Sequence, residues 1–484
     1  MYPMDQLVPA AIQPAAIAVR PVAAATSCGP AAVALRLPAA AQVLLAKTLK
    51  PHAIVAGRRR LALFAATVCL FVTIVPVEIA YASEMWVSRT IAGIPIHFML
   101  TGMVLLVAFA NDSTYLLQVL RRPSVIFFAA CLMLVVVVGF VRNGGNRYII
   151  FADLYTIRWF FVGFMLMRLA IISGSLRQFL SAAAVVVLAT SLRIDAKNTM
   201  GGEIDTTLVR ASSNDLFTVM NLGTIVLALL VTVNWPRGVY HVAFCSAAFA
   251  MLIFLGGIRT STRSLFAVQT LCFLLCLFAL SRDPRMVGKG QGLRRAMVVV
   301  LLLTAVMLAY LVVKGQILGN VTQLGTRFEA ETMVKHDTGA ARVTEAIDML
   351  QQLTPLEWAV GMGVGGMFFN TLGYWASVPH IAVLGWLQKG GLFILAVAFW
   401  ALYIRPFVSF VAATAAPRRD AIVPPPILIV GPPLLAWASL TFISGGLDIG
   451  AFLGLGLLSA LWMQLADDER RFTAVKAGRA RASR

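Results

Sequence analysis

The sequence predicts an all-α, polytopic membrane protein with about twelve transmembrane helices and one large polar segment between the ninth and the tenth. Hydrophobic residues make up 60% of the 484 positions, whereas roughly half is usual in soluble domains. The apolar residues gather into runs long enough to cross a bilayer. Only one long polar interval, residues 316–379, lies between such runs. Together these observations exclude an ordinary soluble globular protein.

The expected spans are apolar runs that approach the length of about 17 to 25 residues needed to cross a bilayer. In chain order they lie at residues 61–82, 91–110, 125–141, 148–172, 179–192, 216–233, 240–256, 264–281, 296–313, 380–404, 427–443 and 447–465. The fifth of these runs is short, so its ends are the least well defined.

The placement of basic residues predicts the orientation of the spans. A net charge of +19 would suggest nucleic acid in a soluble chain, but in a membrane protein the distribution of Lys and Arg between loops reports topology, so no nucleic acid partner is expected. With a cytoplasmic N-terminus, most of the basic groups fall inside: Arg121 and Arg122, Arg168 and Arg177, Arg237, residues 282–295, residues 405–419 and the C-terminal tail. Both termini are then cytoplasmic, and residues 316–379 face outward.

These assignments divide the chain into five parts. Residues 1–57, rich in Ala and Pro, are expected to form a disordered cytoplasmic tail, and residues 58–314 to hold the first nine spans. Residues 315–379 form the external loop, residues 380–465 hold the last three spans, and residues 466–484 form a basic cytoplasmic tail. The six cysteines lie in apolar spans or in the N-terminal tail. Because no Cys and His residues have the spacing of zinc ligands, a structural zinc site is not expected. No other metal and no cofactor is expected either.

The external loop contains a predicted amphipathic helix and a glycine-rich run. Apolar residues at 343, 347, 350 and 353 recur close to one helical face, and Thr354-Pro355 should end this helix at the surface. The run Gly361-Met-Gly-Val-Gly-Gly366 is expected to be a flexible backbone stretch. It lacks the preceding strand that a nucleotide-binding loop requires.

Arginines on the predicted outer side need an explanation other than topology. Arg259 and Arg263 lie four residues apart at the outer mouth of the eighth span. In a helix they would share one face and repel each other unless an anion lay between them, which indicates a polyanionic ligand. The alternative is that both side chains reach lipid phosphates. Arg342 is the one cation of the amphipathic helix, where a surface ion pair with Glu345 or Asp348 is the simpler interpretation.

Four further residues are candidate site residues because they are polar and lie at the start of an expected span or within one. His380 follows a proline where the tenth span begins, and a neutral imidazole there could act as a general base or simply make an interfacial hydrogen bond. Lys389 lies about 13 Å deeper along that helix, so it should face protein or a water-filled cavity. Asp153 and Arg158 in the fourth span are similarly costly in lipid. Five residues apart, they point to different faces and need not pair with each other.

Three short patterns resemble the superfamily of bacterial O-antigen ligases and O-antigen or exopolysaccharide polymerases. The first is Thr260-Ser-Thr-Arg263-Ser at the mouth of a span, and the second is Gly339-Ala-Ala-Arg342, followed by Pro355-Leu356 and Gly361-Met-Gly-Val-Gly365. The third is His380-Ile-Ala-Val-Leu384 with Leu387 and Gly391-Leu392. The similarity covers residues 255–404 and the topology. It implies a GT-C-like membrane fold in the bacterial inner membrane.

The resemblance implies metal-independent glycosyl transfer from an undecaprenyl-diphosphate-linked glycan to a glycan acceptor. The other partners it implies are the lipids of the inner membrane and, as one option, a chain-length regulator. Arg263 and Arg342, together with Arg259, would bind the diphosphate, because the arginine fork matches phosphate geometry. His380 would serve as the catalytic base for the acceptor hydroxyl. Lys389, Arg158 and Asp153 would line the cavity.

Two departures from the family pattern bear on the reaction. Ile381 follows His380 where the ligases usually have Asn or Ser, and Lys389 stands where an acidic or neutral residue is commoner. Both favour a repeat-unit polymerase over a ligase that transfers glycan to lipid A core or another acceptor. A third alternative, from another class, is a transporter of polysaccharide or lipid-linked oligosaccharide, since charged residues within spans often line a pathway.

Overall fold

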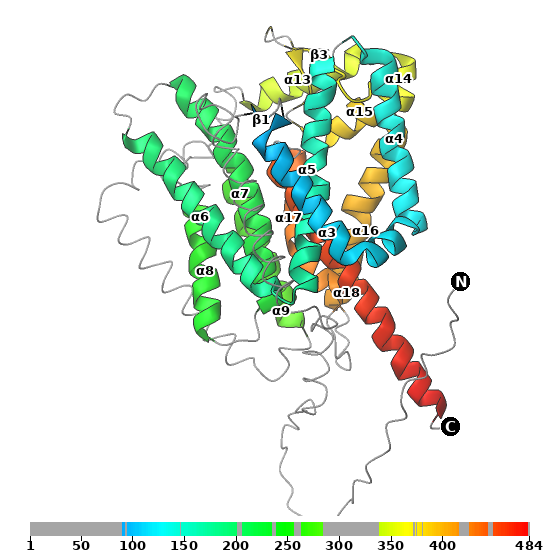
Figure 1. Cartoon of the computed structure of the whole chain (residues 1–484). Coiled ribbons are helices and arrows are strands. Elements are labelled where there is room, and N and C mark those ends of the chain that lie inside the picture. The colour runs from blue at the N-terminus through cyan, green and yellow to red at the C-terminus, as the bar shows by residue number, and fades with distance from the viewer. Residues whose placement is uncertain are drawn as a thin grey trace, which may run out of the picture. The chain divides into compact units, whose positions relative to one another are not determined.

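The computed structural model describes residues 90–91, 94–145, 147–200, 206–234, 239–255, 263–283, 338–370, 373, 375–379, 381–415, 425–443 and 449–482, and they are mostly helical (Figure 1). Within these residues, six helical stretches are long and apolar enough to cross a membrane: Thr101–Leu120, Pro123–Asn143, Ile149–Ile172, Ser264–Arg282, Val383–Ala415 and Gly450–Arg471. Four shorter apolar helices are Leu176–Leu192, Val219–Val233, Phe244–Ile253 and Pro426–Phe442. The chain is thus an all-α membrane protein.

Every one of these apolar helices overlaps an expected span, whereas the expected spans 61–82 and 296–313 lie outside the described residues. In chain order the helices are α3 (Ile96–Leu120), α4 (Pro123–Asn143), α5 (Arg147–Ile172), α6 (Leu176–Met200), α7 (Thr206–Asn234), α8 (Val239–Ile253), α9 (Arg263–Arg282), α13 (Thr338–Gln352), α14 (Pro355–Val360), α15 (Val383–Ala398), the π-helical η4 (Phe399–Ile404), α16 (Arg405–Ala415), α17 (Pro426–Ile443) and α18 (Ile449–Ala482). Because α18 continues to Ala482, most of the predicted basic tail is helical.

Two very short antiparallel ladders add to the helices that were predicted. Strand β1 (Thr90–Ile91) pairs with β2 (Ile94–Pro95) just before α3. Strand β3 (Phe368–Phe369) pairs with β4 (Trp375–Ala376), with Phe368 opposite Ala376 and Phe369 opposite Trp375. The second ladder belongs to the polar segment that precedes α15.

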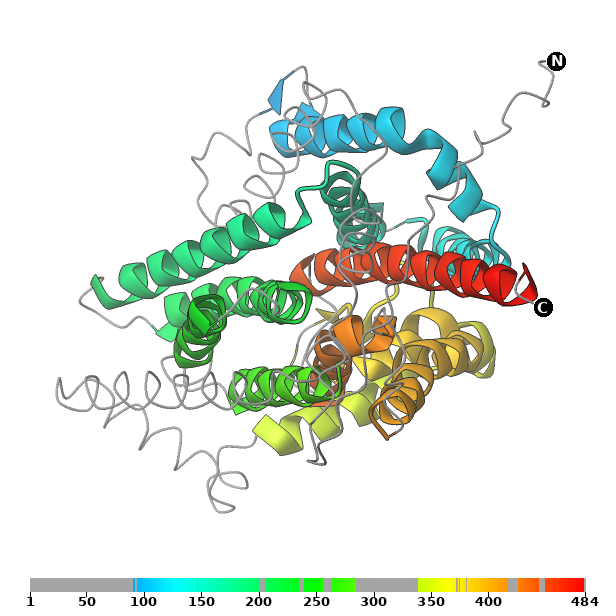
Figure 2. The ribbon, with the colours of Figure 1, turned by 90° about the horizontal axis from the view of Figure 1, so that it is seen from below.

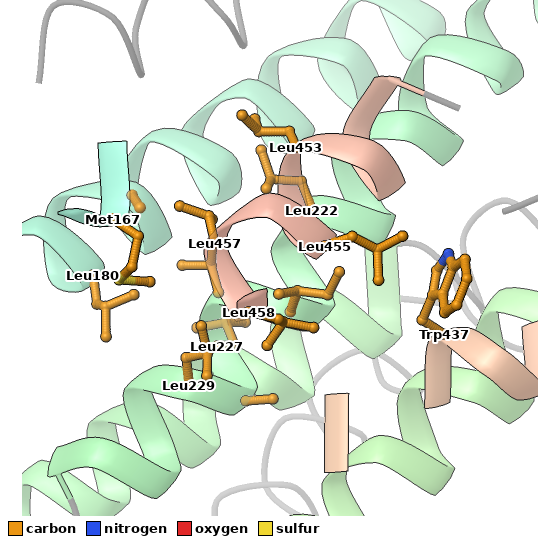
Figure 3. Packing of buried hydrophobic residues seen from close by; sticks show 14 of the residues in the cluster. Met167, Leu180, Leu222, Leu227, Leu229, Trp437, Leu453, Leu455, Leu457 and Leu458 are labelled. Carbon is orange, nitrogen blue, oxygen red and sulfur yellow. The ribbon is translucent and has the colours of Figure 1, made fainter. Parts of the chain in front are cut away.

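The hydrophobic core is built around α18, which packs against α5, α7 and α17 (Figure 2). Figure 3 shows the leucines of α18 among those of α7, with Met167 and Leu180 on one side and Trp437 on the other. The contact between α5 and α18 is especially close, since a Cβ at Gly163 would lie 2.0 Å from the backbone oxygen of Leu453. Small residues allow such an approach of two helices within a membrane.

A group of buried and half-buried polar side chains joins α3, α4, α5 and α18 near the ends of α3 and α5 and the beginning of α4. Arg168, which the predicted topology places toward the inner side, is buried within α5. Its Nε donates to Asp112 at 2.7 Å and its Nη1 donates to Gln464 at 2.6 Å. Nearby, Nη2 of Arg122 lies 2.6 Å from Oδ2 of Asp467. Burial lowers the pKa of Arg122, but the hydrogen bond and charge of Asp467 outweigh it and hold this pKa above its ordinary value.

Candidate functional site

The described part of the polar segment, residues 338–379, is packed onto the helices. Helix α13 contacts β3, and α14 packs along α15 (Figure 1). A small hydrophobic cluster joins these elements to one another: Met349, Leu353, Met362, Phe368, Ala376 and Leu387. The segment is therefore held in a fixed position on the membrane helices.

The junction between α13 and α14 confirms the helix end predicted at Thr354-Pro355. Helix α13 ends at Gln352, and Pro355 occupies the first turn of α14. Thr354 and Glu357 form a capping box, because the Thr354 hydroxyl accepts from the Glu357 N–H and a Glu357 oxygen accepts from the Thr354 N–H. The second oxygen of Glu357 lies 2.9 Å from Nη2 of Arg142, at the end of α4. The cap thereby ties α14 to a membrane helix.

The glycine turn, residues 361–366, is buried between α4, α5 and α15, which corrects the expectation of a flexible stretch. The N–H groups of Met362 and Gly363 donate to carbonyls of α15, and the N–H of Val364 donates to a carbonyl of α4. Gly363 has φ 72°, and a Cβ there would lie 2.1 Å from the backbone nitrogen of Gly139. Glycine is required at this position because the backbone is left-handed and touches another backbone, so it gives close approach and not mobility.

A charged pair holds the other side of the glycine turn. Oδ2 of Asp153 in α5 lies 2.6 Å from Nζ of Lys389 in α15, and both side chains are 16% exposed. The same carboxylate oxygen accepts from the N–H of Gly365 at 2.8 Å, and Lys389 donates to the carbonyl of Gly366 at 2.9 Å. Lys389 faces protein, as predicted. It lies just before Gly391, where the helical conformation of α15 is interrupted.

An open pocket of about 660 Å³ lies against this turn. It is lined by Arg142, Asn143, Gly145, Ile149, Gly365, Met367 and Trp375. Asn143 donates to the carbonyls of Met362 and Val364 in the turn. The ion pair of Arg142 with Glu357 and the hydrogen bond from Gly365 to Asp153 therefore hold two of the lining residues in place. A concave site with a few polar groups at fixed positions is typical of small-ligand binding.

Helix α13 is amphipathic, but the predicted apolar face is only partly the buried one. Val343 and Ile347 are exposed, whereas Glu345 and Asp348 are buried together with Met349. Half-buried Arg342 lies on the same helix. The buried face thus includes two carboxylates, which simple hydrophobic periodicity assigns to water.

The structure places only some of the predicted site residues. Arg263 is the first residue of α9, but its side chain, Arg259 and His380 lie outside the described residues. The convergence of Arg263 and Arg342 on one anion stays a prediction. Asp153 pairs with Lys389 and not with Arg158, whose guanidinium carbon lies 4.4 Å from the ring centre of Tyr155.

Several residues of the site were not found from the sequence. Arg142 and Asn143 end a span on the side predicted to face outward, so an arginine there was a departure from the positive-inside rule that could have been noticed. The Thr-Pro-Leu-Glu pattern ending at Glu357 is a recognisable capping box. No local pattern indicated that Trp375 would line a pocket.

The site and fold define a membrane protein with a structured polar segment on its helix ends. Comparisons of the chain with protein-family models, curated proteins and solved structures found no match.

Proposed function

We propose that this protein is a glycosyltransferase of the bacterial inner membrane that polymerises undecaprenyl-diphosphate-linked oligosaccharide repeat units into exopolysaccharide or O antigen. The observation that carries the proposal is the open pocket beside the glycine turn, at the end of α4 and the beginning of α5, where the described part of the polar segment (residues 338–379) packs onto the membrane helices. A substrate with a lipid tail and a polar head has to be bound at such a boundary. The resemblance of the Arg263, Arg342 and His380 patterns to polymerases supports the same reaction.

The reaction makes one bond and breaks one. An acceptor hydroxyl attacks the anomeric carbon of the lipid-linked glycan, and the new glycosidic C–O bond replaces the anomeric C–O bond to phosphate. His380 takes the hydroxyl proton as general base. Undecaprenyl diphosphate leaves with the bonding electron pair, and the guanidinium groups of Arg263, Arg342 and Arg259 stabilise its developing charge. On this proposal, replacing Arg263 by Lys should abolish polymer, because a point charge lacks the bidentate fork.

The outward orientation of the polar segment is part of the proposal. One span precedes the polar segment and one follows it. At the far ends of these two spans lie basic clusters, at residues 282–295 and 405–419, and basic clusters are usually cytoplasmic. A reporter enzyme active only outside the cytoplasm, fused near Lys335, should be active. A fusion near Lys335 that is active only in the cytoplasm would overturn this topology and the proposed site with it.

Deleting the gene separates the proposed function from its rivals. A polymerase deletion should accumulate single lipid-linked repeat units at the outer face. A ligase deletion would instead accumulate long polymer on the undecaprenyl carrier, and no polymer would be attached to lipid A core. The buried charges and the interruption of α15 at Gly391 are also compatible with a transporter. A transporter deletion would leave repeat units at the inner face. Either of the last two results would refute polymerisation.

A further inference from the structure

Two exposed aromatic rings stand together on the hairpin of β3 and β4. Phe369 is 44% exposed and Trp375 is 61% exposed. They are cross-strand partners, with ring centroids 5.4 Å apart and planes at 65°. Large apolar groups that lie side by side on a protein surface contact a ligand, a partner or the membrane.

The hairpin that carries the rings is fixed to its surroundings. The side chain of Gln352, at the end of α13, donates to the carbonyl of Phe369 at 2.6 Å and accepts from its N–H at 2.8 Å. The neighbouring Phe368 is fully buried, and Ala376 belongs to the same hydrophobic cluster. The rings are thus held in position before any ligand arrives, which lowers the entropic cost of binding.

Trp375 also lines the open pocket beside the glycine turn, where the other lining groups include polar ones. Arg142 uses Nη2 in its ion pair with Glu357, and the guanidinium carries further N–H donors. Asn143 and Gly365 line the same pocket. The volume of about 660 Å³ is within the range of roughly 300 to 1,000 Å³ found for small-ligand pockets.

We propose that this pocket is a saccharide-binding subsite in which Trp375 stacks on one sugar ring and Arg142 bonds its hydroxyl groups. A sugar ring has an apolar C–H face and a rim of hydroxyls, whereas an indole ring has a negative face that attracts C–H groups. The juxtaposition of an exposed indole and a guanidinium in one pocket matches both parts. The choice of a sugar as occupant rests on the proposed function. With this choice, the glycan part of the lipid-linked substrate, and not its diphosphate, binds in the pocket.

Binding of simple sugars to the intact protein tests the assignment. Methyl glucoside, methyl galactoside and methyl glucuronide are offered to the full chain in lipid nanodiscs, and saturation-transfer NMR detects contact. At least one of the three should receive saturation, most strongly at the C–H protons of one ring face. Trp375→Ala should weaken its affinity about fivefold or more, and Trp375→Tyr should retain most of it. Trp400→Ala is the matched control, because Trp400 is 60% exposed, lies in η4 and does not line the pocket.

Three results would overturn the subsite. The first is no saturation transfer to any of the three glycosides in the wild type, and the second is equal saturation transfer in wild type and Trp375→Ala. The third is quenching of Trp375 fluorescence by brominated lipids, measured as the difference between wild type and Trp375→Phe. The last result would make Trp375 a lipid anchor. Because binding is read without any transfer reaction, glycoside binding at Trp375 in a chain that makes no polymer would refute the proposed function alone.

Discussion

Replacing Lys389 by methionine should destabilise the protein strongly, although the new side chain is apolar and similar in length. Lys389 is the cation of a buried pair with Asp153, at 2.6 Å, and both side chains are 16% exposed. The substitution leaves the Asp153 carboxylate buried with the N–H of Gly365 and without its counter-charge. It also removes the hydrogen bond from Nζ to the carbonyl of Gly366.

Removing one partner of a buried ion pair typically costs about 3 to 5 kcal/mol, since an uncompensated charge stays in a low-dielectric environment. The double variant Asp153→Asn with Lys389→Met leaves no buried charge, and the asparagine oxygen can still accept from Gly365. It should therefore be more stable than Lys389→Met alone by about 1 to 3 kcal/mol. Arg470→Met is the matched control, because Arg470 pairs with Asp467 at 2.8 Å but is 70% exposed. Exposed pairs contribute only about 0 to 1 kcal/mol.

Equilibrium unfolding in mixed detergent micelles gives the free energy of unfolding for each variant, and helical circular dichroism follows the transition. Lys389→Met should lose several times more free energy than Arg470→Met. The single variant Asp153→Asn is measured as well. Equal small losses in Lys389→Met and Arg470→Met, or a loss in the double variant equal to the sum of the losses in Asp153→Asn and Lys389→Met, would show that the pair is not a buried, coupled unit.

The remaining predictions concern the turn, the buried polar group of α5 and the two residues of the proposed reaction. Gly363→Ala should destabilise the protein by more than about 1 kcal/mol, whereas Gly102→Ala, where a Cβ meets nothing within 4 Å, should be neutral or stabilising in the same unfolding assay. Arg168→Met should cost about 3 to 5 kcal/mol by leaving the charge of Asp112 buried, and an unchanged unfolding transition would contradict this. Arg342→Lys should abolish polymer in cells with unchanged protein level, because lysine lacks the bidentate fork, and full activity would reduce Arg342 to a surface charge. His380→Ala should lower the rate of polymer formation by about a hundredfold to ten-thousandfold, with donor binding retained, whereas substantial activity in His380→Gln would assign positioning and not proton transfer.

The positions of the helices could be predicted because long apolar runs have one stable outcome in a bilayer. Every apolar helix of the described residues overlaps an expected span, and the Thr354-Pro355 boundary followed from capping chemistry. These signals are local, since each depends on residues within a few turns of one another. The observed ends differ where the chain beyond a span continues as a helix, as it does in α18.

The contacts of the charged residues could not be predicted, because each depends on positions far apart in the chain. Asp153 and Lys389 are 236 positions apart, and nothing near either one indicates the other. The buried face of α13 also escaped prediction, since periodicity assigns Glu345 to water while the fold buries it. The glycine turn was misjudged for a related reason, because glycine serves both mobile loops and close backbone contacts, and only the position of Gly139 in α4 distinguishes the two.

The most direct test of the proposed polymerisation is reconstitution of the purified protein in nanodiscs with undecaprenyl-diphosphate-linked repeat units as the only substrate. The proposed function predicts a ladder of products that lengthens by whole repeat units with time, together with release of undecaprenyl diphosphate, and the loss of both in His380→Ala. Unchanged single repeat units after incubation with folded wild-type protein, or a ladder that forms equally fast with His380→Ala, would contradict it.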